Sequence, residues 1–241
     1  LNQRNVAVSV PAGPVSVGRS HPRNHDGDWF SVVVTRTVNE PRPGSDEISR
    51  AFEEGWVGNH GYLRADGRRQ AKALAFQGTV LSRQGTPHAE VFVVDLPADL
   101  TEPGEMPLEG TETRRPAPPR GVVQRRLTFT DERAFPGVAA LPRHWLKCSP
   151  DGSQIGFLMK DERGVVQFWT VSPEGGQPRQ VTRNSASIAS AFTWSSDGSK
   201  VAHVMDLSVC VTDVTTGKTV RLTPRNEDPA DAPKPFACVI S

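Results

Sequence analysis

The chain has 241 residues, of which 36% are hydrophobic and 23% are charged, with 21 glycines and 21 prolines. Its 28 lysines and arginines nearly balance its 27 aspartates and glutamates, so the formal net charge is +1. This balance does not favour a nucleic-acid or anionic-membrane partner, and apolar runs such as AEVFVVDL are too short to span a bilayer. The composition indicates a loop-rich folded protein without a membrane span.

The chain begins with Leu1 and shows no basic-then-apolar leader, so we expect an internal or processed segment of a longer protein. Its three cysteines, Cys148, Cys210 and Cys238, lie in or beside apolar runs. Their number is odd and too small for a disulfide framework, which favours buried thiols in a reducing compartment.

The first strand-like runs lie before residue 40. Residues 5–17, NVAVSVPAGPVSV, read as the last two strands of an earlier unit, which we bound at 1–20. Residues 24–36, NHDGDWFSVVVTR, read as the next strand, which follows a turn at Asp26-Gly27.

The segment PGSDEISRAFEEGWVGNH, residues 43–60, predicts a short amphipathic helix. Ser45 is a suitable N-cap, and the two acidic residues after it would lie in the first turn, where the helix dipole favours negative charge. Apolar residues then recur with the spacing of one helical face until Gly55. We therefore expect a helix of about two and a half turns within an insertion spanning residues 38–72.

Two longer runs, ALAFQGTVL and AEVFVVDL, then predict paired strands. A segment rich in proline and charge follows at 97–121, and VVQRRLTF closes the unit. We assign residues 21–130 to one elaborated four-stranded unit with insertions at 38–72 and 97–121.

The rest of the chain is a repeat. KCSPDGSQIGFLM, residues 147–159, matches TWSSDGSKVAHVM, residues 193–205, and both contain an Asp-Gly pair. Each copy continues with a second strand-like run, a glycine turn, and a run that ends in Val-Thr or Leu-Thr. The Asp-Gly pairs suit hairpin turns rather than catalysis.

Four short strands in an interval close to the ~40–45 residues of a propeller blade predict an all-β fold, a β-propeller of four-stranded antiparallel blades. The regular blades would span 143–182 and 190–223, and residues 236–241 would begin another. About three blades would be complete, where closure needs about four to eight. We therefore interpret residues 1–241 as a single incomplete propeller domain with a short helical insertion.

The repeat SPDGSQIGFLMKDERGVVQFWTVSPEGGQPRQVT resembles that of TolB-like β-propeller proteins. PGSDEISRAFEEGWVGNH, EGTETRRPAPPRGVVQRRLTFT and FPGVAALPRHWLKCSPDG more specifically resemble the YidR-like bacterial family, which has no assigned activity. The resemblance implies further blades beyond both ends and a monomeric complete propeller. TolB is a periplasmic protein-binding propeller, so the resemblance favours the periplasm, whereas the cysteine count favours the cytoplasm.

Inserted loops with converging polar groups are where scaffolds usually carry function. The first hypothesis is a non-catalytic recognition scaffold that binds a protein, peptide or glycan at the channel mouth and the 38–72 insertion. The alternative is a solvated acidic helix with no binding role. The candidate ligand-binding residues are Glu53, Glu54, Trp56, Asn59, His60, Arg143 and His144.

A divalent metal defines the second hypothesis. Its candidate ligands are His21, His25, His60 and His144. In oligogalacturonate lyases, a group of propeller enzymes, channel-facing histidines bind a divalent metal. By this analogy the chain would be a metal-assisted lyase or hydrolase acting on an acidic saccharide. No HExxH or CxxC motif is present, and no catalytic residue is assigned.

Five arginines occur between residues 114 and 126. They offer charge for an acidic sugar or a phosphate, but we interpret them as a solvated loop stiffened by proline. They are Arg114, Arg115, Arg120, Arg125 and Arg126.

Overall fold

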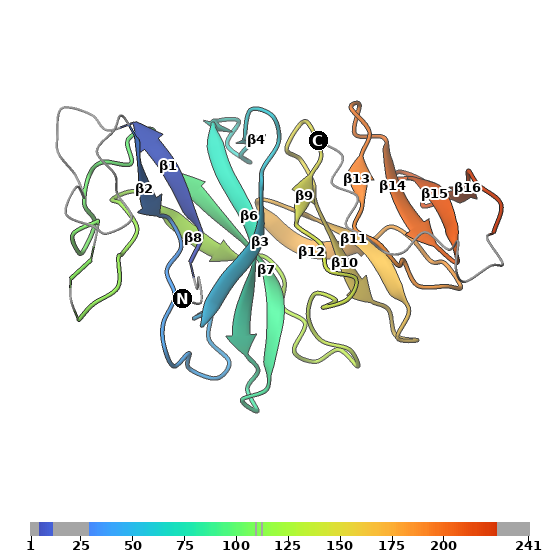
Figure 1. Cartoon of the computed structure of the whole chain (residues 1–241), viewed down its shortest axis with the longest axis horizontal. Helices are drawn as coiled ribbons and strands as arrows, with labels where there is room; N and C mark the ends of the chain where they lie inside the picture. Colours follow the sequence, from blue (N-terminus) through green and yellow to red (C-terminus); the bar gives the residue numbers. More distant parts are fainter. Residues whose placement is uncertain (1–4, 12–28, 109, 112, 226–241) are drawn as a thin grey trace.

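The computed structural model describes residues 5–11, 29–108, 110–111 and 113–225 (Figure 1). Every helix or strand assigned within this part of the chain is a β-strand, so the all-β prediction is confirmed. A search of the same residues for an apolar helix long enough to cross a membrane finds none. The predicted Asp26-Gly27 turn and the predicted strand at 236–241 lie outside the described residues.

The strands are numbered in chain order. They are β1 (Ala7–Pro11), β2 (Trp29–Val33), β3 (Arg50–Trp56), β4 (Tyr62–Leu63), β5 (Arg69–Gln70), β6 (Lys72–Leu81), β7 (Pro87–Leu96), β8 (Val123–Arg126), β9 (Lys147–Cys148), β10 (Ile155–Lys160), β11 (Val166–Ser172), β12 (Gly175–Gln180), β13 (Thr193–Trp194), β14 (Lys200–Met205), β15 (Ser208–Asp213) and β16 (Thr219–Arg221).

Three four-stranded antiparallel sheets form the body of the molecule. Their strand orders are β3-β6-β7-β8, β9-β10-β11-β12 and β13-β14-β15-β16. The last two sheets contain the two sequence repeats, one sheet for each copy. Strands β1 and β2 pair with each other, and β4 and β5 form a small hairpin. In Figure 1 the sheets follow one another from left to right in chain order.

The prediction of a helix after Ser45 is wrong, because residues 50–56 form strand β3. This strand pairs with β6, from Arg50 opposite Thr79 to Trp56 opposite Leu74. The hydroxyl of Ser45 instead donates to the Arg42 carbonyl at 2.7 Å and closes a turn. Local helix signals are weak compared with pairing to a long neighbouring strand, so tertiary contact decided the structure of this segment.

The 38–72 segment therefore supplies the first strand of its sheet. Strand β2, which was expected to begin that unit, pairs with β1 in a separate sheet instead. The 97–121 segment lies between β7 and β8, and its described residues form no strand.

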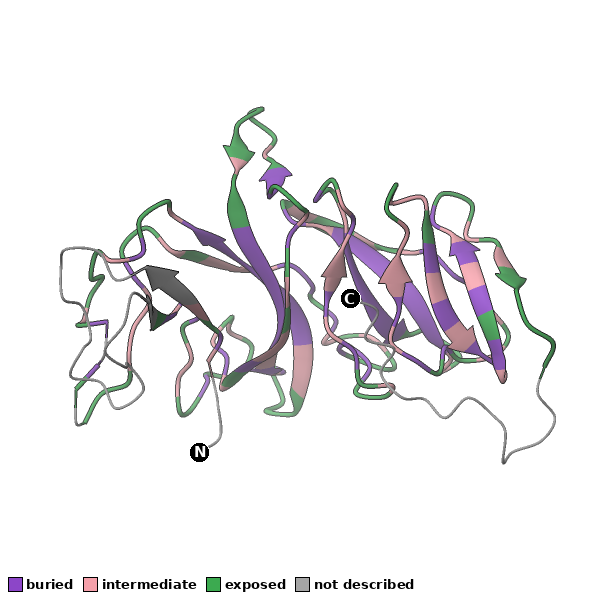
Figure 2. Cartoon of the chain, turned by 45° about the horizontal axis from the view of Figure 1, so that its top comes forward, coloured by how far each residue is buried: buried purple, intermediate pink, exposed green. Residues whose placement is uncertain are grey.

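The sheets stack face to face, and the alternation along their strands shows it. In β7, Phe92 lies in a core shared with Val32 of β2, while Val91 and Val93 lie in a second core. That second core is shared with the following sheet, including Phe157. Consecutive buried residues consequently follow the central strands (Figure 2).

A glycine sets the separation between the second and third of these sheets. A Cβ on Gly156 would lie 2.8 Å from Phe168 Cε2 and 2.9 Å from Phe192 Cε2. Both rings belong to the core between β9–β12 and β13–β16, and they meet edge to face with centroids 4.7 Å apart. The edge-to-face pair therefore occupies the space that a side chain at Gly156 would need.

The closing threonine of each unit ties the fourth strand to the third. Its hydroxyl oxygen accepts a backbone N–H bond in all three sheets, which explains the repeated Leu-Thr and Val-Thr pairs. The bonds are Val91 to Thr128 at 2.9 Å, Phe168 to Thr182 at 2.8 Å, and Val209 to Thr223 at 3.0 Å.

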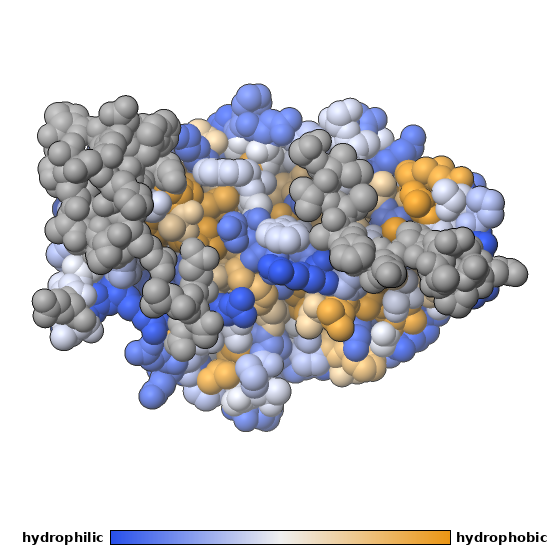
Figure 3. Space-filling model, viewed as in Figure 1, coloured by the Kyte–Doolittle hydropathy of each residue, from blue (hydrophilic) through white to orange (hydrophobic). Residues whose placement is uncertain are grey.

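The outer face of the last sheet keeps apolar side chains exposed: Val209, Val220 and Leu222. Figure 3 shows a hydrophobic area, coloured orange, at this end of the molecule. This exposure contrasts with the other two sheets, which are covered on both faces.

The threonine tie gives a stability prediction with an internal control. We expect Thr182→Val to lower the free energy of unfolding by about 1–3 kcal/mol, because it leaves the buried Phe168 N–H without an acceptor. We expect Thr223→Val, at the exposed copy, to cost about 0.5 kcal/mol or less. Urea denaturation followed by circular dichroism measures both, and equal losses would contradict the structural role.

Candidate functional site

Two clefts flank strand β3. The first, the Trp56 cleft, has a volume of about 1170 Å³ and lies between β1, the end of β3 and residues 96–101. Its polar and aromatic lining comprises Glu54, Trp56, Asn59, His60, Arg69 and Lys72, with an acidic contribution from Asp99. Four of the seven predicted ligand-binding residues are therefore together here.

Trp56 dominates this cleft, since 54% of its surface is exposed. A tight turn at residues 58–61 places Asn59 and His60 beside it. This turn requires glycine, because Gly58 has a φ of 62° and a Cβ there would lie 2.6 Å from the Gly61 carbonyl oxygen. Arg69 Nη1 donates to the His60 carbonyl at 3.2 Å and holds the turn against β5.

The second cleft, the Glu53 cleft, has a volume of about 770 Å³ and lies at the other end of β3. It is bounded by the start of β7 and by the irregular segment 134–144. Its charged and aromatic lining comprises Arg50, Phe52, Glu53, Phe135, Arg143 and Lys160. The predicted residues Glu53, Arg143 and His144 all lie here, so the structure divides the predicted site in two.

Glu53 and Arg143 form an ion pair across this cleft. Arg143 Nε donates to Glu53 Oε1 at 2.7 Å, and the side chain of Glu53 is 9% exposed whereas that of Arg143 is 69% exposed. The guanidinium also lies 4.9 Å from the centre of the Trp145 ring. Arg143 is therefore held at the mouth of the cleft by two neighbours.

His144 is buried, and both of its ring nitrogens are engaged with the backbone. Its Nε2 accepts the backbone N–H of Leu158 at 3.1 Å, and its Nδ1 lies 2.9 Å from the Pro142 carbonyl, to which it donates. The ring is 1% exposed, and burial lowers the pKa of His144 to about 4. Both nitrogens are used, so none is left for a metal ion.

The predicted metal ligands do not converge within the described part of the chain. His60 lines the Trp56 cleft and His144 lines the Glu53 cleft. His21 and His25 lie outside the described residues.

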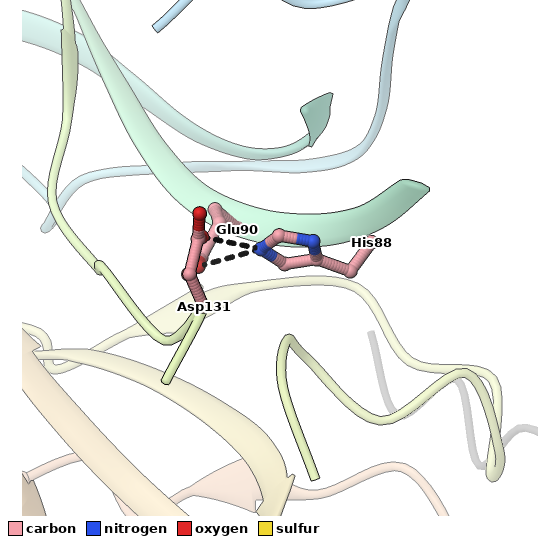
Figure 4. A group of neighbouring side chains, drawn as sticks. All are labelled: His88, Glu90 and Asp131. Carbon is pink, nitrogen blue, oxygen red and sulfur yellow. Dashed lines mark hydrogen bonds and ion pairs between the residues drawn. The ribbon is translucent and has the colours of Figure 1, made fainter. Parts of the chain in front are cut away.

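A different cluster has the spacing of metal ligands: His88, Glu90 and Asp131 (Figure 4). His88 Nε2 lies 3.1 Å from Glu90 Oε1 and 3.0 Å from Asp131 Oδ1. Sequence analysis missed this group, although His88 and Glu90 are two residues apart and therefore on one face of a strand. Asp131 follows β8, so only the sheet brings it near.

The guanidinium of Arg126 adds a positive charge to this cluster. Arg126 Nη2 lies 3.0 Å from both Glu90 Oε1 and Asp131 Oδ1. Its side chain is only 4% exposed, which corrects the prediction that Arg126 belongs to a solvated loop. Since Glu90 also accepts hydrogen bonds from Thr128 and Thr130, this cluster is an internally satisfied ion network.

The network shifts two pKa values in opposite directions. The hydrogen bond to Glu90 raises the pKa of His88, although burial opposes the shift. Burial raises the pKa of Glu90, but its hydrogen bonds from His88, Thr128 and Thr130 outweigh burial and leave it below its usual value. Both shifts favour the charged forms.

These shifts predict how stability depends on pH. The contribution of His88 is fully present below its unfolded pKa of about 6.5 and is lost as pH rises through its higher folded value. Burial lowers the pKa values of His144 and His203 to about 4. These two groups change the stability only below about pH 6.5, where they make it fall as pH falls. As pH rises above about 6.5 and through the raised pKa of His88, we therefore expect a loss of stability due to His88.

Urea denaturation across this range measures the loss. His88→Gln should flatten the pH dependence, whereas His60→Gln, at an exposed position, should keep it. An unchanged slope in His88→Gln would show that the His88–Glu90 contact does not stabilise the folded state.

Comparison with known protein families finds no family model that matches the chain. The uncharacterised protein YidR of Escherichia coli strain K12 is 48% identical over 244 aligned residues, covering 100% of this chain and 55% of YidR. The chain therefore spans about half the length of this curated relative.

Two solved structures match part of the chain. The crystal structure of TolB from Acinetobacter baumannii has a TM-score of 0.39 and 19% identity, and the match covers 81% of this chain and 35% of that one. The structure of a TolB described as putative, from Agrobacterium tumefaciens, has a TM-score of 0.40 and 19% identity, covering 79% and 51%.

The alignment with YidR extends over the whole chain, so it includes both clefts and all three four-stranded sheets. The repeats and the stretch that forms β3 thus lie within the region that is aligned with YidR. The chain is a homologue of the uncharacterised protein YidR.

Proposed function

We propose that the chain is part of a TolB-like β-propeller that serves as a recognition scaffold. The stacked four-stranded sheets act as blades, and the Trp56 cleft receives part of a protein, peptide or glycan. The chain does no chemistry on this ligand in the proposal; it holds it. The 38–72 segment keeps its predicted role in binding, but as the first strand of a sheet.

The observation that carries the proposal is the exposure of Trp56 inside a cleft. Tryptophan contributes more to binding than most residues when it becomes buried against a partner, because it combines a large apolar surface with one hydrogen-bond donor. Here the ring is 54% exposed and stands beside Glu54, Asn59 and His60, which are also exposed. Such an arrangement offers one stacking surface and several polar contacts.

The position of the cleft also supports binding rather than random exposure. Trp56 lies opposite Leu74 in the pairing of β3 with β6, so its backbone is fixed by the sheet. Val57 N donates to the Ala73 carbonyl at 2.9 Å, and Asn59 N donates to the Pro150 carbonyl at 2.9 Å. Binding residues on a rigid support lose little conformational entropy when a ligand binds.

No observation on the described residues favours the metal-assisted lyase or hydrolase. His144 has no free nitrogen, and His60 lies in the other cleft. The His88 cluster already contains the guanidinium of Arg126 at hydrogen-bond distance from both acids. We therefore do not propose this second function.

A binding screen on the 241-residue chain tests the proposal. The probes are a displayed random peptide library and a glycan array, and each ligand selected is then titrated by fluorescence polarisation. We expect Trp56→Ala to weaken a selected ligand by about tenfold or more, because it removes the stacking surface.

The matched control is Val123→Ala, which changes another exposed apolar residue, 49% exposed, that does not line the Trp56 cleft. It should leave every affinity unchanged. If all selected ligands bind Trp56→Ala as tightly as the parent chain, the cleft is not the recognition site.

A further inference from the structure

The Glu53 cleft holds a carboxylate that is only half satisfied. Oε1 of Glu53 accepts from Arg143, but Oε2 is buried and has no hydrogen-bond partner among the described residues. The side chain is 9% exposed and lines the cleft. A buried carboxylate oxygen without a donor is costly, so this geometry suits a ligand that brings an N–H or O–H group.

The backbone at Glu53 adopts a strained conformation. Glu53 has a φ of 52°, in the left-handed region, and lies at an irregularity in the register between Phe52 and Gly55. Its carbonyl accepts the Leu146 N–H at 3.0 Å. Non-glycine residues persist in this conformation when their surroundings hold them, and such strain gathers at functional sites.

Two cations flank the same cleft without an acidic partner. Arg50 and Lys160 form no ion pair with any described carboxylate. Each stands near an aromatic ring: Arg50 is 4.6 Å from the centre of Phe52, and Lys160 is 5.3 Å from that of Phe135. Glu53 is the single carboxylate in the lining, so the cleft favours an anion.

Most of the remaining lining is apolar. It includes Pro136, Val138 and Leu141, and Leu141 is 77% exposed while Phe135 is 37% exposed. A saccharide would bring many hydroxyl groups, but the remaining polar side chains are already engaged. Gln77 Nε2 donates to the His144 carbonyl at 3.0 Å, and His88 Nε2 contacts Glu90 and Asp131.

We propose that the Glu53 cleft binds the carboxyl terminus of a peptide whose last side chain is apolar. Arg50 and Lys160 receive the terminal carboxylate, the last backbone N–H donates to Glu53 Oε2, and the side chain packs on Phe135 and Leu141. This inference deepens the proposed recognition function but uses a different cleft, so each can fail without the other.

Peptide arrays test it. The probes share a Gly-Ser-Gly-Gly leader and vary in their last two residues, and each is made as the free acid, the C-terminal amide, and the free acid with the last backbone nitrogen methylated. We expect apolar-ended free acids to bind with dissociation constants below about 1 mM, and about tenfold more tightly than the other two forms.

The variants assign each preference to a residue. Arg50→Gln should reduce the preference for the acid over the amide, whereas Arg68→Gln, at an exposed turn, should not. Glu53→Gly should abolish the preference for N–H over N-methyl. It should not lower the melting temperature, because glycine accepts a φ of 52° without strain.

Trp56→Ala separates this inference from the proposed function, since it should leave both preferences intact. The inference is overturned if amides bind as well as acids, or if both preferences survive in Arg50→Gln and Glu53→Gly. Binding of trigalacturonate with no binding of any peptide would also overturn it, in favour of an acidic glycan.

Discussion

Face-to-face burial of four-stranded sheets is the constraint on which the rest of this structure depends. One such sheet has two faces and an apolar residue at almost every position of its central strands, so neither face can remain in water. Stacking solves the problem for β3-β6-β7-β8, whose strand β7 supplies Phe92 to one core and Val91 to the other. The separation of the sheets is set by small features such as Gly156, where two aromatic rings occupy the space of a side chain.

Strand β3 shows how this stacking creates the candidate sites. It pairs with β6 along one edge, and its bulge brings Glu53 against the backbone of Leu146 in the segment that leads into the next sheet. Gly55 allows this approach, since a Cβ there would lie 2.0 Å from the Leu146 carbonyl oxygen. The strand thus presents Trp56 at its end and Glu53 at its bulge. One strand therefore supplies residues to both clefts, and its pairing with β6 fixes their backbone positions.

Charge inside the fold is handled by pairing rather than by exclusion. Glu90 is fully buried, and it is kept ionised by a guanidinium, an imidazole and two threonines. The equivalent position in the next sheet is Gln167, whose Oε1 accepts from Thr182 at 2.7 Å. The contrast with Glu53 is physical: both carboxylates are buried, but only Glu90 has donors for each oxygen. This difference separates the ion network around Glu90 from the binding site that we propose at Glu53.

The sequence by itself determined the all-β class, the four-stranded repeat, the Asp-Gly turns of the two repeats, and three of the β3 residues that line the clefts, Glu53, Glu54 and Trp56. These follow from local signals in the sequence: alternation of apolar and polar residues, turn residues, and the polar and aromatic residues around Trp56. It predicted a short helix within the 38–72 segment where β3 forms, placed Arg126 in solvent, and missed the His88 cluster. Each depends on partners far away in sequence: β6 for β3, and Glu90 and Asp131 for Arg126. Only the tertiary structure decided that the predicted site is two clefts, because Glu53 and Trp56 lie at different positions along β3, on either side of its register irregularity, and each position meets different neighbouring segments.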